Sequence, residues 1–183
     1  MNKFVIFASA RTGSTSLSIV LGQSKGVKMA AEPFHPDFTK WNSESVSYKK
    51  LLDKTKDLDS TLNKIFRRYT AFKTLHNQLT EVQNLQLLGR KDLKILFLVR
   101  RRLFDQIVSD LVAHQVGKWN DTHKDTYKSL KALNPKEMKK KIGYVHRSNN
   151  KYLSFLENNK KVTIWSYFTK ICIPSAMKTT SRQ

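Results

Sequence analysis

The chain has 183 residues, with 34 lysines and arginines against 14 aspartates and glutamates, so its formal net charge is +20. This length is enough for one domain with a hydrophobic core, and no apolar run approaches the roughly 20 residues that a membrane-spanning helix needs. The excess of positive charge predicts anionic partners, such as nucleic acid, a nucleotide, an acidic glycan or an acidic membrane surface.

The first predicted elements are a strand, a loop and a helix. Residues 4–7 form an apolar run that is typical of a buried strand, and residues 16–21 have apolar side chains at helical spacing. The loop between them consists of small and hydroxyl-bearing residues with one arginine, Arg11, and one glycine, Gly13. A strand that enters a helix through such a loop directs backbone N–H groups and the positive end of the helix dipole at one point. The stretch therefore predicts a phosphate site, although a simple tight turn with a serine N-cap is the alternative.

The next segment predicts a second strand at residues 27–31 that ends at Glu32 and Pro33. In a parallel strand–helix–strand unit, Arg11 and Glu32 would lie at the same edge of the sheet. Residues 34–42 are expected to be loop, because Pro33 and Pro36 exclude a regular helix.

Residues 43–68 have a helical pattern that is expected to break near residues 57–60, where Asp59 or Ser60 could cap the second helix. A third strand is predicted at residues 69–75. The helix predicted at residues 80–88 is expected to stop at Gly89.

The clearest strand is at residues 93–99, an unbroken apolar run of the kind found in central parallel strands. A helix should follow from Leu103. A polar loop at 117–126, a long basic helix at 135–158, a last strand at 162–165 and a frayed tail at 175–183 complete the prediction. This alternation predicts a single three-layer α/β domain over residues 1–174, with a mainly parallel sheet of about five strands.

A second charged motif begins where the central strand ends. Arg100, Arg101 and Arg102 stand at the edge of the sheet where open α/β proteins bind ligands. Ser109 follows Arg101 at a spacing that keeps both residues on one face of a helix. Three adjacent arginines repel one another, and an anion would relieve this repulsion. A basic loop that simply leads into a helix is the alternative interpretation.

The first loop, A-R-T-G-S-T at residues 10–15, resembles the 5′-phosphosulfate loop of sulfotransferases that use PAPS, 3′-phosphoadenosine 5′-phosphosulfate. It is most similar to the P-R-T-G-S-[TN] loop of the bacterial carbohydrate sulfotransferases, of the nodulation and trehalose type, with Ala10 in place of proline. The phosphate loop of triphosphatases requires G-x-x-x-x-G-K-[ST]. Here its first glycine is missing and Gly13 stands at the lysine position, so a kinase or triphosphatase is disfavoured.

The second motif resembles the 3′-phosphate motif of the same family, R-R-D-x-x-x-Q-A-[VI]-S, with Gln106 and Ser109 in register. The resemblance implies a P-loop-like nucleotide-binding architecture. It also implies an enzyme that uses PAPS and releases PAP as its product. Arg101 and Ser109 would bind the 3′-phosphate, with Arg100 as a neighbour, and Arg102 replaces the usual aspartate. The residues that would hold the 5′-phosphosulfate are Arg11, Thr12, Gly13, Ser14, Thr15 and Ser16.

Three residues are candidates for the base that activates the acceptor hydroxyl. Glu32, in A-E-P-F-H-P, resembles the acidic residue of an E-P-F stretch in the carbohydrate sulfotransferases. A salt bridge to Arg11 is its alternative role. His35 is the competing base, and His76 is a weaker third choice. No metal cluster is expected, since His114 and His123 have no partners at ligand spacing.

The predicted function is transfer of the sulfuryl group of PAPS to a hydroxyl of a carbohydrate or other small acceptor, possibly acidic. Two alternatives stay open: a P-loop-like nucleotide-binding protein without sulfotransferase activity, and a basic nucleic-acid-binding protein. No specific nucleic-acid partner is expected. One cysteine, Cys172, and an N-terminus that enters a strand at once favour a cytoplasmic protein.

Overall fold

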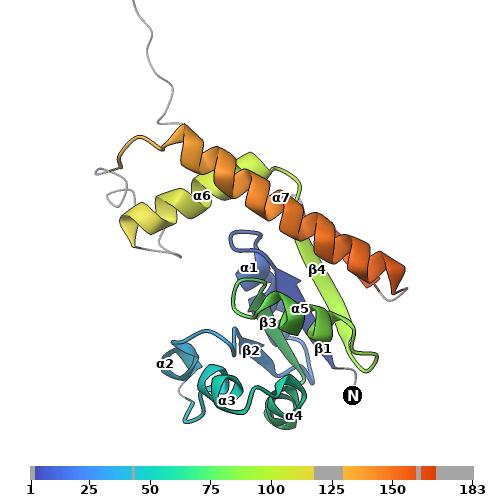
Figure 1. The fold of residues 1–183 in the computed structure, drawn as a ribbon. Coiled ribbons are helices and arrows are strands. Elements are labelled where there is room, and N and C mark those ends of the chain that lie inside the picture. Colours follow the sequence, from blue (N-terminus) through green and yellow to red (C-terminus); the bar gives the residue numbers. More distant parts are fainter. Residues whose placement is uncertain (1–2, 43, 118–129, 160–161, 168–183) are drawn as a thin grey trace, which may run out of the picture.

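The computed structural model describes residues 3–42, 44–117, 130–159 and the backbone of residues 162–167. Within these ranges the strands form one parallel sheet in the order β2-β3-β1-β4-β5 (Figure 1). The strands are β1 (Phe4–Ala8), β2 (Met29–Ala31), β3 (Ala71–Leu75), β4 (Lys94–Arg100) and β5 (Val162–Tyr167). The predicted α/β class and parallel sheet are therefore confirmed. The tail predicted at 175–183, and the loop predicted at 117–126 beyond Gly117, lie outside the described residues.

The helices follow the predicted alternation with the strands. They are α1 (Ser14–Gly22), α2 (Phe38–Asn42), α3 (Tyr48–Thr55), α4 (Leu58–Arg68), α5 (Glu81–Leu88), α6 (Leu103–Val116) and α7 (Pro135–Asn158). Local sequence fixes several of their ends. Thr80 and Gln83 form a capping box at the start of α5, and Pro135 occupies the first turn of α7 after the cap Asn134. None of the described helices combines the length and hydropathy that crossing a membrane requires.

Two local predictions were wrong. The segment expected to be a loop at 34–42 contains α2, because Pro36 precedes the helix and so removes none of its hydrogen bonds. Burial stabilises this short helix, since Phe38 is fully buried and its ring lies 5.5 Å from that of Tyr48. The cap of α4 is Asp57, whose Oδ1 accepts a hydrogen bond from the Ser60 amide at 2.9 Å, rather than Asp59 or Ser60.

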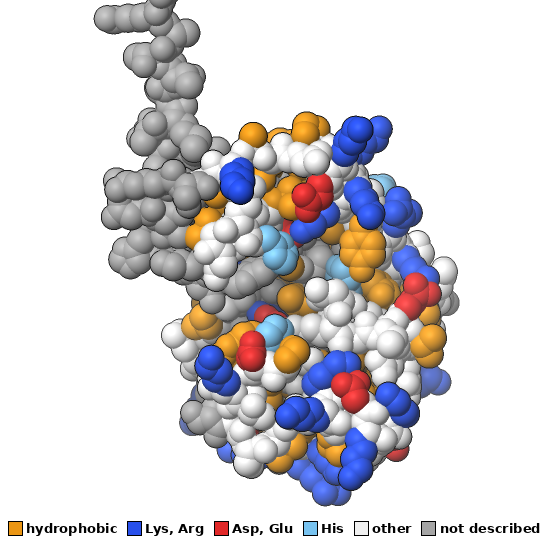
Figure 2. All heavy atoms as spheres, turned by 60° about the vertical axis from the view of Figure 1, so that its left-hand side comes forward, with side chains coloured by type: hydrophobic (Ala, Val, Ile, Leu, Met, Phe, Trp, Pro, Cys, Tyr) orange, Lys and Arg blue, Asp and Glu red, His pale blue; other side chains and the backbone are white. Residues whose placement is uncertain are grey.

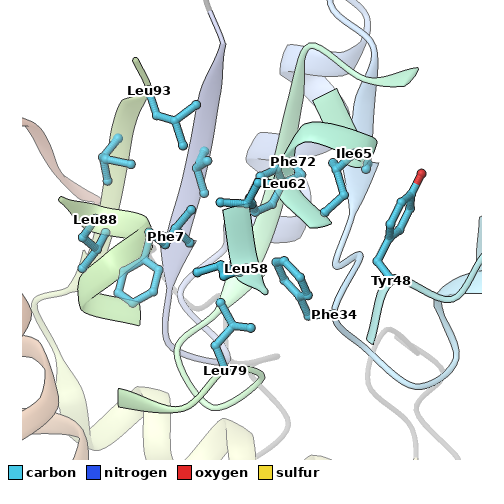
Figure 3. Packing of buried hydrophobic residues seen from close by; sticks show 14 of the residues in the cluster. Phe7, Phe34, Tyr48, Leu58, Leu62, Ile65, Phe72, Leu79, Leu88 and Leu93 are labelled. Atoms are coloured by element: carbon cyan, nitrogen blue, oxygen red, sulfur yellow. The ribbon is translucent and has the colours of Figure 1, made fainter. Parts of the chain in front are cut away.

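Helices cover both faces of the sheet. On one face, α1 packs Leu17 and Leu21 against Ile6, Ala8 and Leu98 of the central strands. The other face carries the larger core, to which α4, α5 and α7 contribute, and Figure 3 shows Phe7 and Phe72 of the sheet in this cluster. The buried residues of these helices in the cluster are Leu58, Leu62, Ile65, Leu87, Leu88, Tyr152 and Leu156. The predicted three layers are therefore confirmed.

The two helices after β4 form a smaller unit beside the sheet. Ile107 and Leu111 of α6 pack against Val145 of α7. Figure 1 shows α6 next to the start of α7, near the end of the sheet at which β1 and β4 lead into their loops. Because every strand pair is parallel, all five strands end at this same edge. The fold therefore places the start of α6 next to the loop that follows β1.

Candidate functional site

The loop between β1 and α1 has the geometry of an anion site. Arg11 and Gly13 both have left-handed backbone conformations, with φ of 64° and 87°. Gly13 is the N-cap of α1, the cap has no side-chain hydrogen bond, and the first turn contains no acidic residue. The first N–H groups of a helix have no partners within it, so those of α1 are available to a ligand together with the positive end of the dipole.

The hydroxyl groups of the loop have separate tasks. Thr12 is buried and its Oγ1 donates to the Ser9 carbonyl at 3.0 Å, so this hydroxyl holds the loop together. Thr15 and Ser16 lie in the first turn of α1 and are exposed. Thr15 Oγ1 accepts a hydrogen bond from Lys73 Nζ at 2.8 Å. Ser14 is buried at the first position of the helix.

The second charged motif meets the first loop directly. Arg11 Nε donates to Ser109 Oγ at 2.9 Å, across 98 residues of sequence. Gln106 Nε2 donates to Ser9 Oγ at 2.9 Å and to the Ala10 carbonyl at 2.6 Å. The two motifs that the sequence singled out therefore form one site. Ser109, expected to act with Arg101, contacts Arg11 in the structure.

Of the three consecutive arginines, Arg100 is the buried one. It is 5% exposed, and its Nη1 donates to the Arg11 carbonyl at 3.1 Å, while Nε and Nη2 are buried without hydrogen-bond partners. Burial lowers the pKa of Arg100, the nearby Asp105 acts in the opposite direction, and the positive charges of Arg11 and Arg102 lower it further. Arg101 is exposed, and Arg102 Nε pairs with Asp105 at 3.0 Å. A buried guanidinium with unused donors is suited to an anionic ligand.

Glu32 lies at the end of β2 in a network with two side chains of the β3 segment. Its Oε1 pairs with Lys73 Nζ, and its Oε2 accepts a hydrogen bond from Gln78 Nε2. The side chain of Lys73 is only 3% exposed and also reaches Thr15. The partner found for Glu32 is thus Lys73, where the sequence had suggested Arg11. The residues predicted from sequence do not include Lys73, although a lysine within an apolar strand segment is a usable signal.

Backbone conformation independently marks two of the predicted site residues. Among the described non-glycine residues, positive φ occurs at Arg11, Glu32 and Lys56. Lys56 is the left-handed C-cap of α3, a common way for a helix to end. Arg11 and Glu32 are not helix caps, and Glu32 also precedes Pro33. Such conformations are unfavourable and concentrate at functional sites.

The two histidine candidates differ in environment. His35 Nδ1 accepts a hydrogen bond from the Asp37 amide at 3.1 Å, and its ring stacks on Trp41 at 4.1 Å. A neutral imidazole that accepts at Nδ1 carries its proton on Nε2, so His35 has no nitrogen free to act as a base. His76 is 6% exposed, its Nε2 has no hydrogen-bond partner, and burial lowers its pKa to about 4. Its backbone amide donates to the Ala8 carbonyl at 2.9 Å, beside the start of the loop.

Figure 2 shows one face of the molecule, on which lysine and arginine side chains are spread among polar and hydrophobic ones, with a few acidic side chains and histidines between them. No group of three or more His, Cys, Asp or Glu side chains that could hold a metal ion occurs among the described residues.

Comparison with known proteins shows no family for this chain. No family model matches the chain, and no curated protein matches it. Among solved structures, the chain is similar to shikimate kinase from Acinetobacter baumannii in complex with shikimate, at 12% identity and a TM-score of 0.47. The match covers 92% of this chain and 84% of that chain. At this identity and TM-score, the likeness carries no argument about activity.

Proposed function

We propose that this chain is a PAPS-dependent sulfotransferase that transfers the sulfuryl group to a hydroxyl of a carbohydrate or other small acceptor. The observation that carries the proposal is the contact between Arg11 and Ser109. These residues belong to the two motifs that resemble the 5′-phosphosulfate loop and the 3′-phosphate motif. A nucleotide with phosphates on both sides of its ribose needs two such anion sites close together.

The donors at the sheet edge fit a bis-phosphorylated nucleotide. The 5′-phosphosulfate would be held by Arg11, by the N–H groups at the start of α1 and by its exposed hydroxyls, Thr15 and Ser16. The 3′-phosphate would be held by Arg101 and Ser109, with the unused donors of the buried Arg100 adding charge-assisted hydrogen bonds. When bound, PAPS supplies the sulfuryl group.

We assign the role of base to Glu32. A carboxylate has about four lone-pair sites, so the contacts to Lys73 and Gln78 leave Glu32 able to accept the proton of an acceptor hydroxyl. Lys73 compensates its charge, and Lys73 and Gln78 together hold the carboxylate in place. His76, neutral and buried next to the loop, is the second choice. His35 comes third because its Nδ1 already accepts a hydrogen bond from the Asp37 amide.

The alternative is a P-loop-like nucleotide binder without sulfotransferase activity. The same helix N-terminus and the same arginines could bind a nucleoside triphosphate. That protein would prefer ATP or GTP with magnesium, whereas a nucleic-acid-binding protein would discriminate little among mononucleotides and would lose affinity steeply with salt.

Calorimetry at fixed ionic strength separates these functions. Two charge-assisted contacts to the 3′-phosphate, at roughly 1.5–3 kcal/mol each and partly offset by desolvation, predict that PAP binds at least about a hundredfold tighter than AMP. Arg101→Ala should reduce this ratio and leave AMP binding unchanged. Ser109→Ala should also affect AMP, because Ser109 holds Arg11. Equal affinities for PAP and AMP in the wild-type protein would exclude the sulfotransferase. If PAP binds tighter as expected, transfer of labelled sulfate to a panel of sugars would identify the acceptor class.

A further inference from the structure

We propose that Gln106 is a positioning residue that holds the phosphate loop, defined as residues 9–13, in its anion-binding conformation. The proposal assigns α6 a second task besides carrying Ser109. It depends on the proposed function only for the identity of the nucleotide, because any anion bound by this loop would need the same geometry.

The side-chain amide of Gln106 is hydrogen-bonded at its nitrogen and not at its oxygen. The side chain is 1% exposed, and Nε2 donates to both Ser9 Oγ and the Ala10 carbonyl. Because a carbonyl oxygen can only accept, this contact fixes which end of the amide faces the loop. The opposite end, Oε1, is buried without a partner. A buried amide oxygen without a hydrogen-bond partner lowers the stability of the fold. The two hydrogen bonds that Nε2 donates to the loop offset this loss.

The bonds orient two consecutive peptide groups. Gln106 binds the Ala10 carbonyl, and Arg100 binds the Arg11 carbonyl at 3.1 Å. The described chain contains no cis peptide bonds. In a trans peptide the C=O and the following N–H point in opposite directions. Gln106 and Arg100 hold the carbonyl oxygens of Ala10 and Arg11 toward α6 and β4. The N–H groups of Arg11 and Thr12, in the same two peptides, therefore point to the opposite side of the loop, where they can donate to a ligand.

The same bonds support the left-handed backbone of Arg11. An arginine in this conformation is unfavourable by itself and must be held by its surroundings. Gln106 fixes the peptide before Arg11, Arg100 fixes the peptide after it, and Ser109 binds its side chain at Nε. Gln106 and Ser109 are three positions apart on α6, so one helix face presents both to the loop.

A purely structural role predicts something different. If Gln106 only stabilised α6, the loss of any other pair of side-chain amide hydrogen bonds on this helix should affect the phosphate loop to the same extent. Gln115 provides the matched control. Its Nε2 donates to the Lys131 carbonyl at 3.2 Å and its Oε1 accepts from the Lys131 amide at 3.0 Å, near the other end of α6.

The test compares Gln106→Met and Gln115→Met in the full-length protein. Methionine keeps the length of the side chain and removes the amide. Amide hydrogen exchange of the ligand-free protein should accelerate at least about tenfold in Gln106→Met over residues 17–20, the first hydrogen-bonded amides of α1, of which the Leu17 amide donates to the Gly13 carbonyl of the loop, and stay near wild type there in Gln115→Met. Calorimetry should show that Gln106→Met weakens PAP and AMP by a similar factor, about tenfold or more, because the loop serves the phosphate that both nucleotides share.

Ser9→Ala is a milder variant, for use if Gln106→Met does not fold. It removes one of the two acceptors and should give an intermediate acceleration over the same residues. Wild-type exchange in Gln106→Met or in Ser9→Ala, or equal acceleration in Gln115→Met, would overturn the positioning role. A wild-type protein that binds PAP and AMP equally would refute the sulfotransferase instead, and the exchange comparison would still decide the role of Gln106.

Discussion

Arg100→Met should weaken ligand binding more than it changes folding stability. Arg100 is a buried cation, and in the ligand-free protein its Nη1 donates a hydrogen bond while Nε and Nη2 have no hydrogen-bond partner. The substitution removes one charge-assisted hydrogen bond, Nη1 to the Arg11 carbonyl, worth roughly 1.5–3 kcal/mol. It also removes a buried charge with two unpaired donors, whose desolvation opposes folding. The two terms act in opposite directions. The free energy of unfolding of the ligand-free protein should change by no more than about 1.5 kcal/mol.

Ligand binding should respond much more strongly to the same substitution. If the unused donors of Arg100 bind the nucleotide as proposed, their loss should raise the dissociation constant of PAP by roughly 10- to 100-fold. At a PAP concentration of about 100 times the wild-type dissociation constant, the ligand adds about 2.7 kcal/mol to the stability of the wild type. A 30-fold weaker variant would gain only about 0.9 kcal/mol. For a domain of this size, the melting shift should fall from roughly 5–11 °C to about 2–4 °C.

The assay is urea and thermal unfolding of wild type and variant, with and without PAP. Arg67→Met is the matched control, since it removes one exposed arginine from the last turn of α4, which leads into the start of β3 and so lies at the opposite edge of the sheet. The control should keep the full shift with PAP. A ligand-free Arg100→Met protein destabilised by 3–5 kcal/mol, with the PAP shift intact, would show that Arg100 is a structural cation and refute the reasoning.

Two further predictions follow from the site. Glu32→Gln should leave nucleotide affinity nearly unchanged, lower the chemical step by roughly 10²–10⁴ and destabilise the protein in urea by about 3 kcal/mol, because Lys73 stays buried without its counter-ion. His76→Phe should lower turnover less, and the reverse ranking in single-turnover assays would move the base to His76. The pKa of His76 is about 4 in the folded protein against 6.5 for the free side chain, so the unfolded chain binds the extra proton between these values. Stability should therefore be full above pH 6.5 and fall by on the order of 3 kcal/mol toward pH 4, and His76→Phe should remove that part of the slope in urea titrations.

Much of the candidate site could be predicted because its residues follow strands. Arg11 and Glu32 stand after β1 and β2, and the arginines stand at the end of β4. In a parallel sheet all such positions meet at one edge, so locating the strands locates the site. The contribution of Lys73 is different. Its role depends on contacts with Glu32 and Thr15, which lie 41 and 58 positions earlier in the chain. The local sequence pattern of β3 does not predict those partners.

The sequence by itself determined the fold class, the order of the elements and the composition of both charged motifs. These follow from local properties: apolar runs make strands, helical spacing makes amphipathic helices, and small residues make the turn before α1. Tertiary structure decided which charges are buried. Arg100 and Arg101 are neighbours of the same type, yet Arg100 is the last residue of β4 and is enclosed, while Arg101 lies beyond the strand and is exposed. The tertiary structure also decided that Ser109 contacts Arg11, and that burial of Phe38 stabilises a helix after Pro36. Each of these outcomes depends on contacts between segments far apart in the chain, whose geometry is set only when the sheet and its covering helices pack together.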